Sequence, residues 1–393
     1  MTIQYDFDQI IYRRESDSLK WHHYDEDVLP MWVADMDFIS PEPVVRALRE
    51  RVEHGVFGYP DDGMGMPKNT PALHQTILER MSNLYHWVIK PEDIVFLPGV
   101  VTGFNLACHA LANPDQAVLI QTPVYPPILS AAMQTGILKQ EMELTWNTDG
   151  TYTVDWDLFD KSISPQTRLF ILCNPHNPVG KVFKSDELLH IAQTCLRHHV
   201  AICSDEIHCD LIYRGHQHVP IASLDPEIAQ NTITLIAPSK TYNIPGLQCS
   251  IAIIQNRELR KRYLRARKGL VPWVNLMGLL AAQAAYQQGQ EWLQQVLLYL
   301  EGNRDYLYKS IHEQVVGIDM GLPEATYLGW LDCRKANIPG NPSRFFLEKG
   351  RIAFNDGVDF GKGGEGFIRM NFGCPRINLI NGLKRMEAAM QTL

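Results

Sequence analysis

The chain lacks the sequence features of several large classes of protein. The formal net charge of its 393 residues is −8, so no nucleic-acid-binding surface is expected. No stretch approaches the roughly 20 consecutive apolar residues of a membrane-spanning helix. Residues Met1–Asp8 show no basic segment followed by an apolar one, so we expect no signal peptide. Together these absences favour a cytoplasmic protein.

A metal site and a disulfide framework are also not expected. The eight cysteines are scattered, and no two of them form a Cys-x-x-Cys pair. Cys203, His208 and Cys209 are close in sequence, but their spacing is not that of a zinc site. We therefore predict that no metal is bound and that the cysteines are reduced and mostly buried.

Short apolar runs alternate with helical patterns between about residues 91 and 255. Six runs are β-branched and apolar on both faces, and they begin at Ile94, Ala117, Leu169, Val200, Thr234 and Ser250. Doubly buried strands separated by helices predict an α/β domain with a mostly parallel sheet. The length allows two domains. We predict a large domain over 46–285 and a smaller α+β domain formed by 1–45 and 286–393, with a long helical stretch over 274–316.

Lys240 stands just past the apolar run that ends at Ala237, in a loop closed by Pro245 and Gly246. Burial disfavours the charged form of an amine, so a lysine at this place can become a nucleophile near neutral pH. Such an amine can form a Schiff base with a carbonyl substrate or with pyridoxal phosphate (PLP). Most loop lysines are simply solvated, so the hypothesis depends on the side chains that accompany Lys240.

Polar or glycine-bearing turns follow four of the predicted strands, at Pro98-Gly99, Asn174-Pro175, Ser204–Glu206 and Ser239-Lys240. Ligands of open α/β sheets gather beyond the carboxyl ends of strands, so these turns should converge on one site. Asp205 can place a carboxylate against the pyridinium nitrogen of PLP, although it can also cap a following helix. Gly99, Val100 and Val101 open a predicted helix whose N–H groups and dipole suit a phosphate.

Three further side chains complete a candidate PLP site. Asn174 can donate to the phenolic oxygen of the cofactor ring, although Asn-Pro is also an ordinary turn signal. Tyr125 can cover the ring as an aromatic lid, or it can belong to a surface turn. Arg369 lies on an apolar run and can bind a substrate carboxylate with two parallel hydrogen bonds. A structural ion pair is the alternative for Arg369, and Arg376 is its rival as the carboxylate-binding residue.

The order of these motifs resembles the fold-type I PLP enzymes of the aminotransferase class I/II superfamily. The matching motifs are Gly99-Val-Val, Tyr125, Asn174-Pro-x-Asn-Pro-x-Gly180, Asp205-Glu-Ile, Ser239-Lys240 and Arg369-x-Asn-x-Gly-x-Pro. Within that superfamily the chain is similar to the MalY/PatB-type cystathionine β-lyases, also called C–S lyases. The motifs that carry this narrower similarity are Met31–Phe38, His54–Pro60, Ser204–Asp210, Ser239–Gly246 and Arg369–Arg376.

This resemblance implies a PLP enzyme that performs α,β-elimination on L-cystathionine or a related cysteine S-conjugate, giving a thiol, pyruvate and ammonia. It implies that Lys240 binds the cofactor and acts as the catalytic base. It also implies an obligate homodimer in which Tyr59 reaches the neighbouring subunit's phosphate. The backbone of Val33 and Ala34 would line the substrate side together with Tyr125.

Other positions follow from the same resemblance. His208 would face the ring oxygen, and Ser239 would join the phosphate site. Many relatives carry a serine and an arginine in that site where this chain has Ala237 and Gln248. Each lost group can contribute a charge-assisted hydrogen bond of roughly 1.5–3 kcal/mol, so we expect PLP to bind less tightly.

Two other functions fit the same residues. An aminotransferase of a small or aromatic amino acid would use Lys240 to return the proton to the cofactor instead of expelling a thiolate. A PLP-bound regulatory protein that acts through a partner's surface is the third hypothesis. Replacement of Lys240 or Asp205 would have favoured it, and both residues are present.

Overall fold

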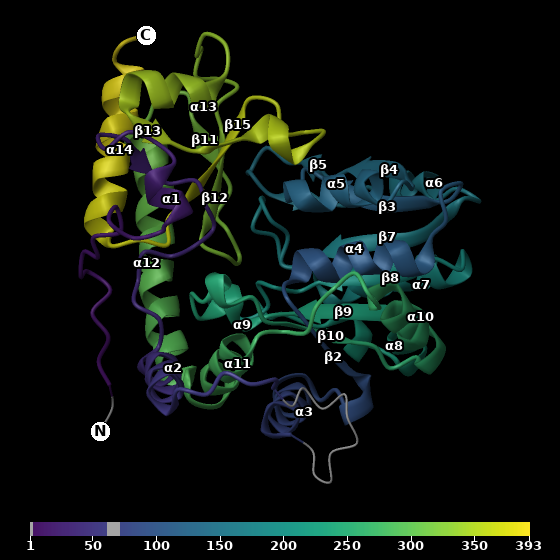
Figure 1. The fold of residues 1–393 in the computed structure, drawn as a ribbon. Coiled ribbons are helices and arrows are strands. Elements are labelled where there is room, and N and C mark those ends of the chain that lie inside the picture. Colours follow the sequence, from purple (N-terminus) through teal and green to yellow (C-terminus); the bar gives the residue numbers. More distant parts are fainter. Residues whose placement is uncertain (1–2, 61–70) are drawn as a thin grey trace.

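The computed structural model describes residues 3–60 and 71–393. The predicted ranges 1–45 and 46–285 therefore include two stretches, 1–2 and 61–70, that lie outside the described residues. One half of the molecule is built on a seven-stranded sheet (Figure 1). Its strands, in spatial order, are β2 (Ile94–Leu97), β10 (Ser250–Ile253), β9 (Thr232–Ile236), β8 (Ala201–Asp205), β7 (Thr167–Cys173), β3 (Ala117–Thr122) and β4 (Leu138–Glu143).

All six predicted runs form strands of this sheet, which confirms the predicted α/β class. The sheet is parallel except for β10, which is antiparallel to both β2 and β9. Strand β4 was not predicted, because Leu138–Glu143 is mostly polar; half of its residues are exposed. It lies at the edge of the sheet, where one row of backbone groups and many side chains meet water.

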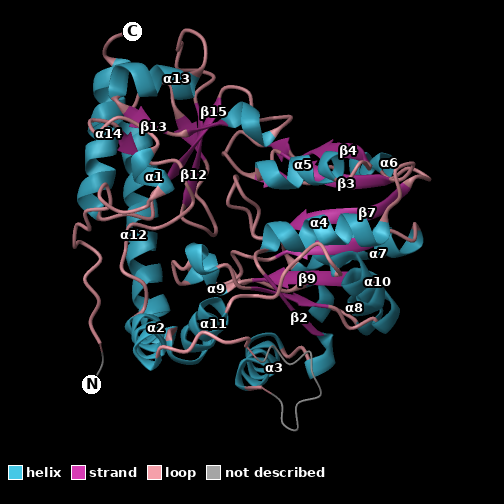
Figure 2. Ribbon diagram, in the orientation of Figure 1, coloured by secondary structure: helices cyan, strands magenta, loops and turns pink. Residues whose placement is uncertain are grey.

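Helices cover both faces of the sheet (Figure 2). Leu169 and Ile171 of β7 pack in the cluster that contains helices α4 (Val100–Leu111), α5 (Pro126–Gln134) and α10 (Arg257–Arg267). Phe170 and Leu172 point to the other face, toward α6 (Trp156–Ser162), α7 (Ser185–Arg197) and α8 (Pro226–Gln230). Successive side chains of a strand alternate between faces, so a strand buried on both sides is apolar throughout.

The other half contains a four-stranded antiparallel sheet. Its order is β11 (Asp319–Met320), β12 (Leu328–Asp332), β15 (Phe367–Asn371) and β14 (Asn355–Asp356), and helices α13 (Pro342–Phe345) and α14 (Arg376–Met390) accompany it. The N-terminal segment joins this half, since β1 (Leu29–Pro30) pairs in parallel with β13 (Ile352–Ala353). Further elements are α1 (Leu19–His22), α2 (Glu42–His54), α3 (Ala72–Tyr85), α9 (Pro238–Thr241) and the hairpin of β5 (Thr145–Trp146) with β6 (Tyr152–Thr153). The division at residues 45 and 285 stays a prediction.

The long helical stretch predicted over 274–316 is divided into two helices. Helix α11 (Leu276–Gln288) ends and α12 (Gln290–Gln314) begins at Gly289, where an added Cβ would meet the Ala285 carbonyl oxygen at 2.5 Å and the Tyr242 ring at 2.6 Å. In Figure 1, α12 runs from α11 to the second sheet. Among residues 3–60 and 71–393, no helix combines the length and apolar character that a membrane crossing requires.

Candidate active site

A cavity of about 280 Å³ lies at the carboxyl ends of β2, β7, β8 and β9. Nine of the predicted site residues line it, namely Ala34, Gly99, Val100, Val101, Tyr125, Asp205, His208, Ser239 and Lys240. The turns after these strands therefore converge as the sequence predicted. The lining also contains residues that were not predicted, including Phe104 and Asn177.

Lys240 lies on the short helix α9, directly after β9. Its Nζ donates a hydrogen bond of 2.7 Å to the carbonyl oxygen of Ala34. Burial lowers the pKa of the amine to about 8; Arg369 acts in the same direction, and Asp35 and Asp205 oppose it. A lysine with this pKa has a much larger neutral fraction near pH 7 than an exposed lysine. The amine can therefore act as a nucleophile or a base.

Asp205 ends β8 and is buried, with 4% of its surface exposed. Burial raises the pKa of its carboxyl group to about 7, while a 3.1 Å hydrogen bond from the Ile207 amide and the charge of Lys240 act in the opposite direction. A turn follows it, not a helix, so the capping alternative is wrong. An acid buried with so few partners is suited to a cationic ligand group.

His208 lies in the turn after β8 and is also buried. Burial, together with the charges of Lys240 and Arg369, lowers the pKa of its imidazole to about 3. The ring is therefore neutral near pH 7. Its edge faces Tyr327, with ring centroids 6.1 Å apart, and its Nδ1 has no hydrogen-bond partner among the described residues.

Asn174 leaves a buried donor unused. Its Oδ1 accepts a 3.1 Å hydrogen bond from the Phe183 amide, which fixes the side chain. Its Nδ2 is fully buried without a partner among the described residues. Buried polar groups in proteins are nearly always hydrogen-bonded, so such a donor indicates a ligand acceptor. Asn174 does not itself line the cavity, but its backbone amide donates to the Asp205 carbonyl at 2.9 Å, so the two residues are neighbours.

The N-terminus of α4 forms one wall of the cavity. Gly99 is the N-cap and has φ 116°, a conformation that favours glycine. Its amide donates to Ser250 Oγ at 3.2 Å, while the first amides of the helix have no intrahelical acceptor. Lys240 is the only lysine or arginine among the described lining residues, and Gln248, which also lines the cavity, is neutral. A phosphate here would depend on backbone N–H groups and the helix dipole.

Arg369 lies on β15 and is buried, but it does not line the cavity. Its Nη1 donates to Asn177 Oδ1 at 2.9 Å, and its Nη2 donates to Asn355 Oδ1 at 2.7 Å and to the Trp32 carbonyl at 3.3 Å. The guanidinium also lies 4.9 Å from the Phe360 ring centroid. No carboxylate of the described residues pairs with it, so this part of the structure gives no support to the ion-pair alternative. Burial lowers its pKa to about 10.

The remaining predicted residues do not line the cavity. Tyr59 is 91% exposed and contacts the edge of Trp273; it lines a separate cavity of about 410 Å³. Val33 is near the site through its carbonyl, which accepts from Asn371 Nδ2 at 2.5 Å. Arg376, the rival of Arg369, donates to Asn303 Oδ1 at 2.6 Å and is half-buried outside the cavity.

Asn177 is the main side chain that the sequence interpretation missed. It lines the cavity and holds Arg369, and its carbonyl accepts a 3.0 Å hydrogen bond from the Tyr125 amide. The signal was present, because Asn177-Pro178 repeats the Asn174-Pro175 pattern three residues later.

The fold and the cavity together define an α/β protein of fold type I with a low-pKa lysine at the carboxyl edge of its main sheet. The family model for aminotransferase class I and II matches residues 31–386, and the chain belongs to this family. It is 38% identical to the cystathionine beta-lyase PatB of Bacillus subtilis (strain 168), over 98% of this chain and 99% of that protein. The predicted family is thereby confirmed.

Two solved structures are similar over nearly the whole chain. The crystal structure of OvoB shares 43% sequence identity with a TM-score of 0.92, and covers 99% of this chain and 100% of its own. Cystalysin from Treponema denticola, whose structure contains pyridoxal 5'-phosphate, shares 32% identity with a TM-score of 0.93, over 99% of this chain and 100% of its own.

Proposed function

We propose that this protein is a PLP-dependent carbon–sulfur β-lyase. It cleaves L-cystathionine or a related cysteine S-conjugate to a thiol, pyruvate and ammonia. The observation that supports this best is the pairing of a low-pKa amine, Lys240, with a buried and almost unpartnered acid, Asp205, in one cavity. The similarity to the cystathionine beta-lyase PatB supports the reaction type.

The donor set of the cavity fits PLP. Bound PLP supplies an electron sink that acidifies the α-proton of an amino acid. We assign Lys240 to its covalent attachment, Asp205 to its ring nitrogen and Asn174 to its phenolic oxygen, with His208 and Tyr125 beside the ring. The raised pKa of Asp205 and the unpartnered Nδ2 of Asn174 support these assignments. The phosphate is assigned to the residues at the start of α4 and after β9, namely Gly99, Val100, Val101 and Ser239.

The protein's own groups then have distinct tasks. Arg369 binds the substrate carboxylate, for which its buried guanidinium without a carboxylate partner is suited. The backbone of Val33 and Ala34 and the Tyr125 ring enclose the substrate. Lys240 accepts the proton from the α-carbon as a general base, which its pKa of about 8 permits near neutral pH. The substrate's Cβ–S bond breaks, the thiolate leaves, and hydrolysis gives pyruvate and ammonia.

An aminotransferase of a small or aromatic amino acid is the second candidate. The match to the aminotransferase class I and II family and the use of the same lysine and arginine favour it. Elimination and amino transfer differ by the relative height of two barriers, where about 1.36 kcal/mol corresponds to a tenfold change in rate. The substrate's β-substituent therefore has a large effect on which reaction is observed.

We further propose a homodimer in which Tyr59 reaches the partner subunit's phosphate. Exposed apolar side chains near Tyr59 support this proposal. Val56, Phe57 and Trp273 are each more than half exposed, and a partner subunit would bury them. A cytoplasmic location is supported by the eight cysteines, which are buried and not in disulfides.

Product analysis tests the reaction type. The purified protein is incubated with PLP and cystathionine, then with cysteine, and then with alanine plus 2-oxoglutarate. The lyase predicts release of thiol and pyruvate from cystathionine, whereas amino transfer without thiol release would overturn it. Borohydride treatment followed by peptide mass spectrometry tests the site, since a pyridoxyl group is expected on Lys240, and its presence on another lysine would refute the assignment.

A further inference from the structure

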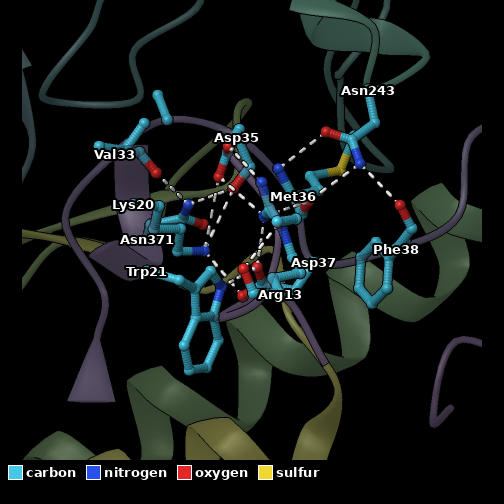
Figure 3. A network of polar contacts seen from close by, with 12 residues as sticks. Arg13, Lys20, Trp21, Val33, Asp35, Met36, Asp37, Phe38, Asn243 and Asn371 are labelled. Carbon is cyan, nitrogen blue, oxygen red and sulfur yellow. Dashed lines mark hydrogen bonds and ion pairs between the residues drawn. The ribbon is translucent and has the colours of Figure 1, made fainter. Parts of the chain in front are cut away.

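The segment Val33–Phe38 crosses the candidate site without regular secondary structure, yet its backbone is held at nearly every residue. Figure 3 shows side chains from distant parts of the chain converging on it. The Ala34 carbonyl in this segment accepts hydrogen bonds from Lys240 Nζ at 2.7 Å and from the Tyr327 hydroxyl at 2.9 Å. A carbonyl oxygen has two lone pairs, so both are used.

Asn371 holds this segment from the second sheet. Its Nδ2 donates to the carbonyls of Val33 at 2.5 Å and Asp35 at 2.7 Å, on either side of Ala34. The side chain is fully buried, and its Oδ1 accepts from the Gly373 amide at 2.7 Å, so it has no freedom to turn away. The two bonds fix the direction of the Ala34 carbonyl between them.

Asn243 holds the segment from the turn after α9, three residues after Lys240. Its Nδ2 donates to the Met36 carbonyl at 2.9 Å and the Phe38 carbonyl at 2.7 Å, and its Oδ1 accepts from the Met36 amide at 3.0 Å. The loop that carries Lys240 is thereby tied to the segment that carries its acceptor.

A cluster of four charges anchors the same segment. Lys20 is 1% exposed and contacts Asp37 Oδ2 at 2.7 Å and the Asp35 carbonyl at 3.3 Å. Arg13 pairs with Asp35 at 2.9 Å and with Asp37 at 2.6 Å, and Trp21 Nε1 donates to Asp37 at 2.9 Å. Two cations balance two carboxylates, which is the condition under which buried charges persist. The cluster leaves the segment little freedom to move away from Lys240.

We propose that the Ala34 carbonyl is the resting acceptor for the Lys240 amine whenever that amine is free, that Asn371 and Asn243 are positioning residues that hold this carbonyl, and that Tyr327 is a second donor that competes with the amine for it. The role in turnover rests on the proposed lyase function. During turnover the Lys240 amine must detach from the cofactor, accept a proton and attach again. A fixed acceptor keeps the free amine close to the reacting atoms and so limits the positions that it can occupy.

The three variants that test this inference are expected to shift the titration midpoint of Lys240 in different directions. Loss of Asn371 or Asn243 loosens the carbonyl, so the Lys240 ammonium loses a partner and its titration midpoint falls. Tyr327→Phe removes the competing donor, so the carbonyl is a stronger acceptor for the ammonium and the midpoint rises. The other polar groups that interact with Lys240 remain in every variant; they are Asp35, Asp205, His208 and Arg369, and Tyr125 lines the same cavity.

The measurement is competitive acetylation of the full-length chain freed of cofactor, followed by mass spectrometry of the Lys240 peptide across pH. We expect the midpoint to fall by about half to one pH unit in Asn243→Gly and Asn371→Ala and to rise by a similar amount in Tyr327→Phe. Asn243 has φ 55°, so glycine fits its backbone and this variant is expected to fold.

Matched control variants distinguish a specific effect on the Ala34 carbonyl from a general loosening of the protein. Asn337→Gly makes the same change at φ 52° on an exposed loop, and Tyr263→Phe removes another buried hydroxyl, which donates to the Gly103 carbonyl at 2.8 Å. Neither is expected to move the Lys240 midpoint. Shifts of one sign in all variants, or equal shifts in the controls, would refute the inference.

The titration of Lys240 tests the Ala34 acceptor independently of which reaction the enzyme catalyses. Opposite shifts in a protein that releases no thiol from cystathionine would support the Lys240 acceptor and refute the lyase. If the protein releases thiol from cystathionine but none of the variants moves the Lys240 midpoint, the lyase is supported and the Ala34 acceptor is refuted. With an active enzyme, Asn243→Gly is also expected to lower kcat by about tenfold with little change in KM, because the base is displaced and the Arg369 contact is retained.

Discussion

At the scale of single residues, the buried carboxyl of Asp205, which we assign to the cofactor ring nitrogen, lowers the stability of the cofactor-free fold. Its carboxyl is buried and has a pKa of about 7 in place of the ordinary 3.8. The unfolded chain ionises this group near pH 4, whereas the folded chain keeps its proton until about pH 7. The folded state therefore loses stability as pH rises between these values, and the loss is complete above the folded pKa.

Asp205→Asn is therefore expected to stabilise the cofactor-free chain at high pH. The amide keeps the shape and the acceptor for Ile207 but never ionises. We expect a gain of about 2–4 kcal/mol in the free energy of unfolding at about pH 8, and less than half of that at about pH 5. Urea unfolding of both proteins at the two pH values measures it. A gain that is equal at both values, or a loss at high pH, would contradict the raised pKa.

Gln248 is the second residue whose replacement is informative. It lines the cavity near the start of α4, and Lys240 is the one cationic side chain among the described lining residues. Gln248→Arg is expected to tighten PLP binding about tenfold or more, because a guanidinium–phosphate contact contributes about 1.5–3 kcal/mol. Fluorescence titration of the apo chain measures the dissociation constant. Gln248→Met is the control, and it should not tighten binding; if it does so as much as arginine, charge is not the cause.

The sequence predicted those site residues whose position follows from a strand. Asp205 and Lys240 come directly after apolar runs, so their convergence at one sheet edge follows from the parallel arrangement. The contact of Lys240 with Ala34 was not predictable in this way, because it joins residues 206 positions apart and uses a backbone carbonyl. Asn371 and Tyr327 were missed for the same reason, since both act on backbone groups of a segment without regular structure.

At the scale of elements, the sequence identified the central strands and misjudged a helix boundary. Runs that are apolar on both faces can be recognised without knowing their neighbours, whereas the polar edge strand β4 cannot. The break between α11 and α12 depends on Gly289, and its cause lies outside the helices. The Tyr242 ring and the Ala285 carbonyl occupy the space of a Cβ there.

Gly289→Ala is expected to destabilise the protein by about 1–3 kcal/mol, since a Cβ at 2.5 Å from backbone oxygen and 2.6 Å from a ring forces the helices or Tyr242 to move. Tyr242 is two residues after Lys240, so PLP binding should weaken as well. Thermal unfolding of the holo- and apo-protein measures both effects. Gly246→Ala, where no atom lies within 4 Å of an added Cβ, is the control. Equal stability of the two variants would show that the close contact is relieved at no cost.

At the scale of the whole molecule, the phosphate side of the site is the part that one chain supplies least well. The described lining offers backbone amides and Ser239 there but no arginine. Tyr59, meanwhile, is 91% exposed beside other exposed apolar side chains, including Phe57 and Trp273. Exposed apolar side chains that lie together favour association, and in the proposed two-fold dimer each Tyr59 would contact the other subunit.

A hybrid dimer of two impaired variants tests this shared site. In the proposed dimer, Lys240→Ala removes the base from a subunit's own site, whereas Tyr59→Ala would remove a phosphate contact from the partner's site. In a hybrid dimer both defects therefore fall in one site, and the other site is intact. Random reassortment of equal amounts makes half of the dimers hybrid, so about a quarter of wild-type lyase activity is expected to return. If Tyr59 served its own subunit, each hybrid would contain two single-defect sites, and mixing would restore nothing beyond the average of the two parents.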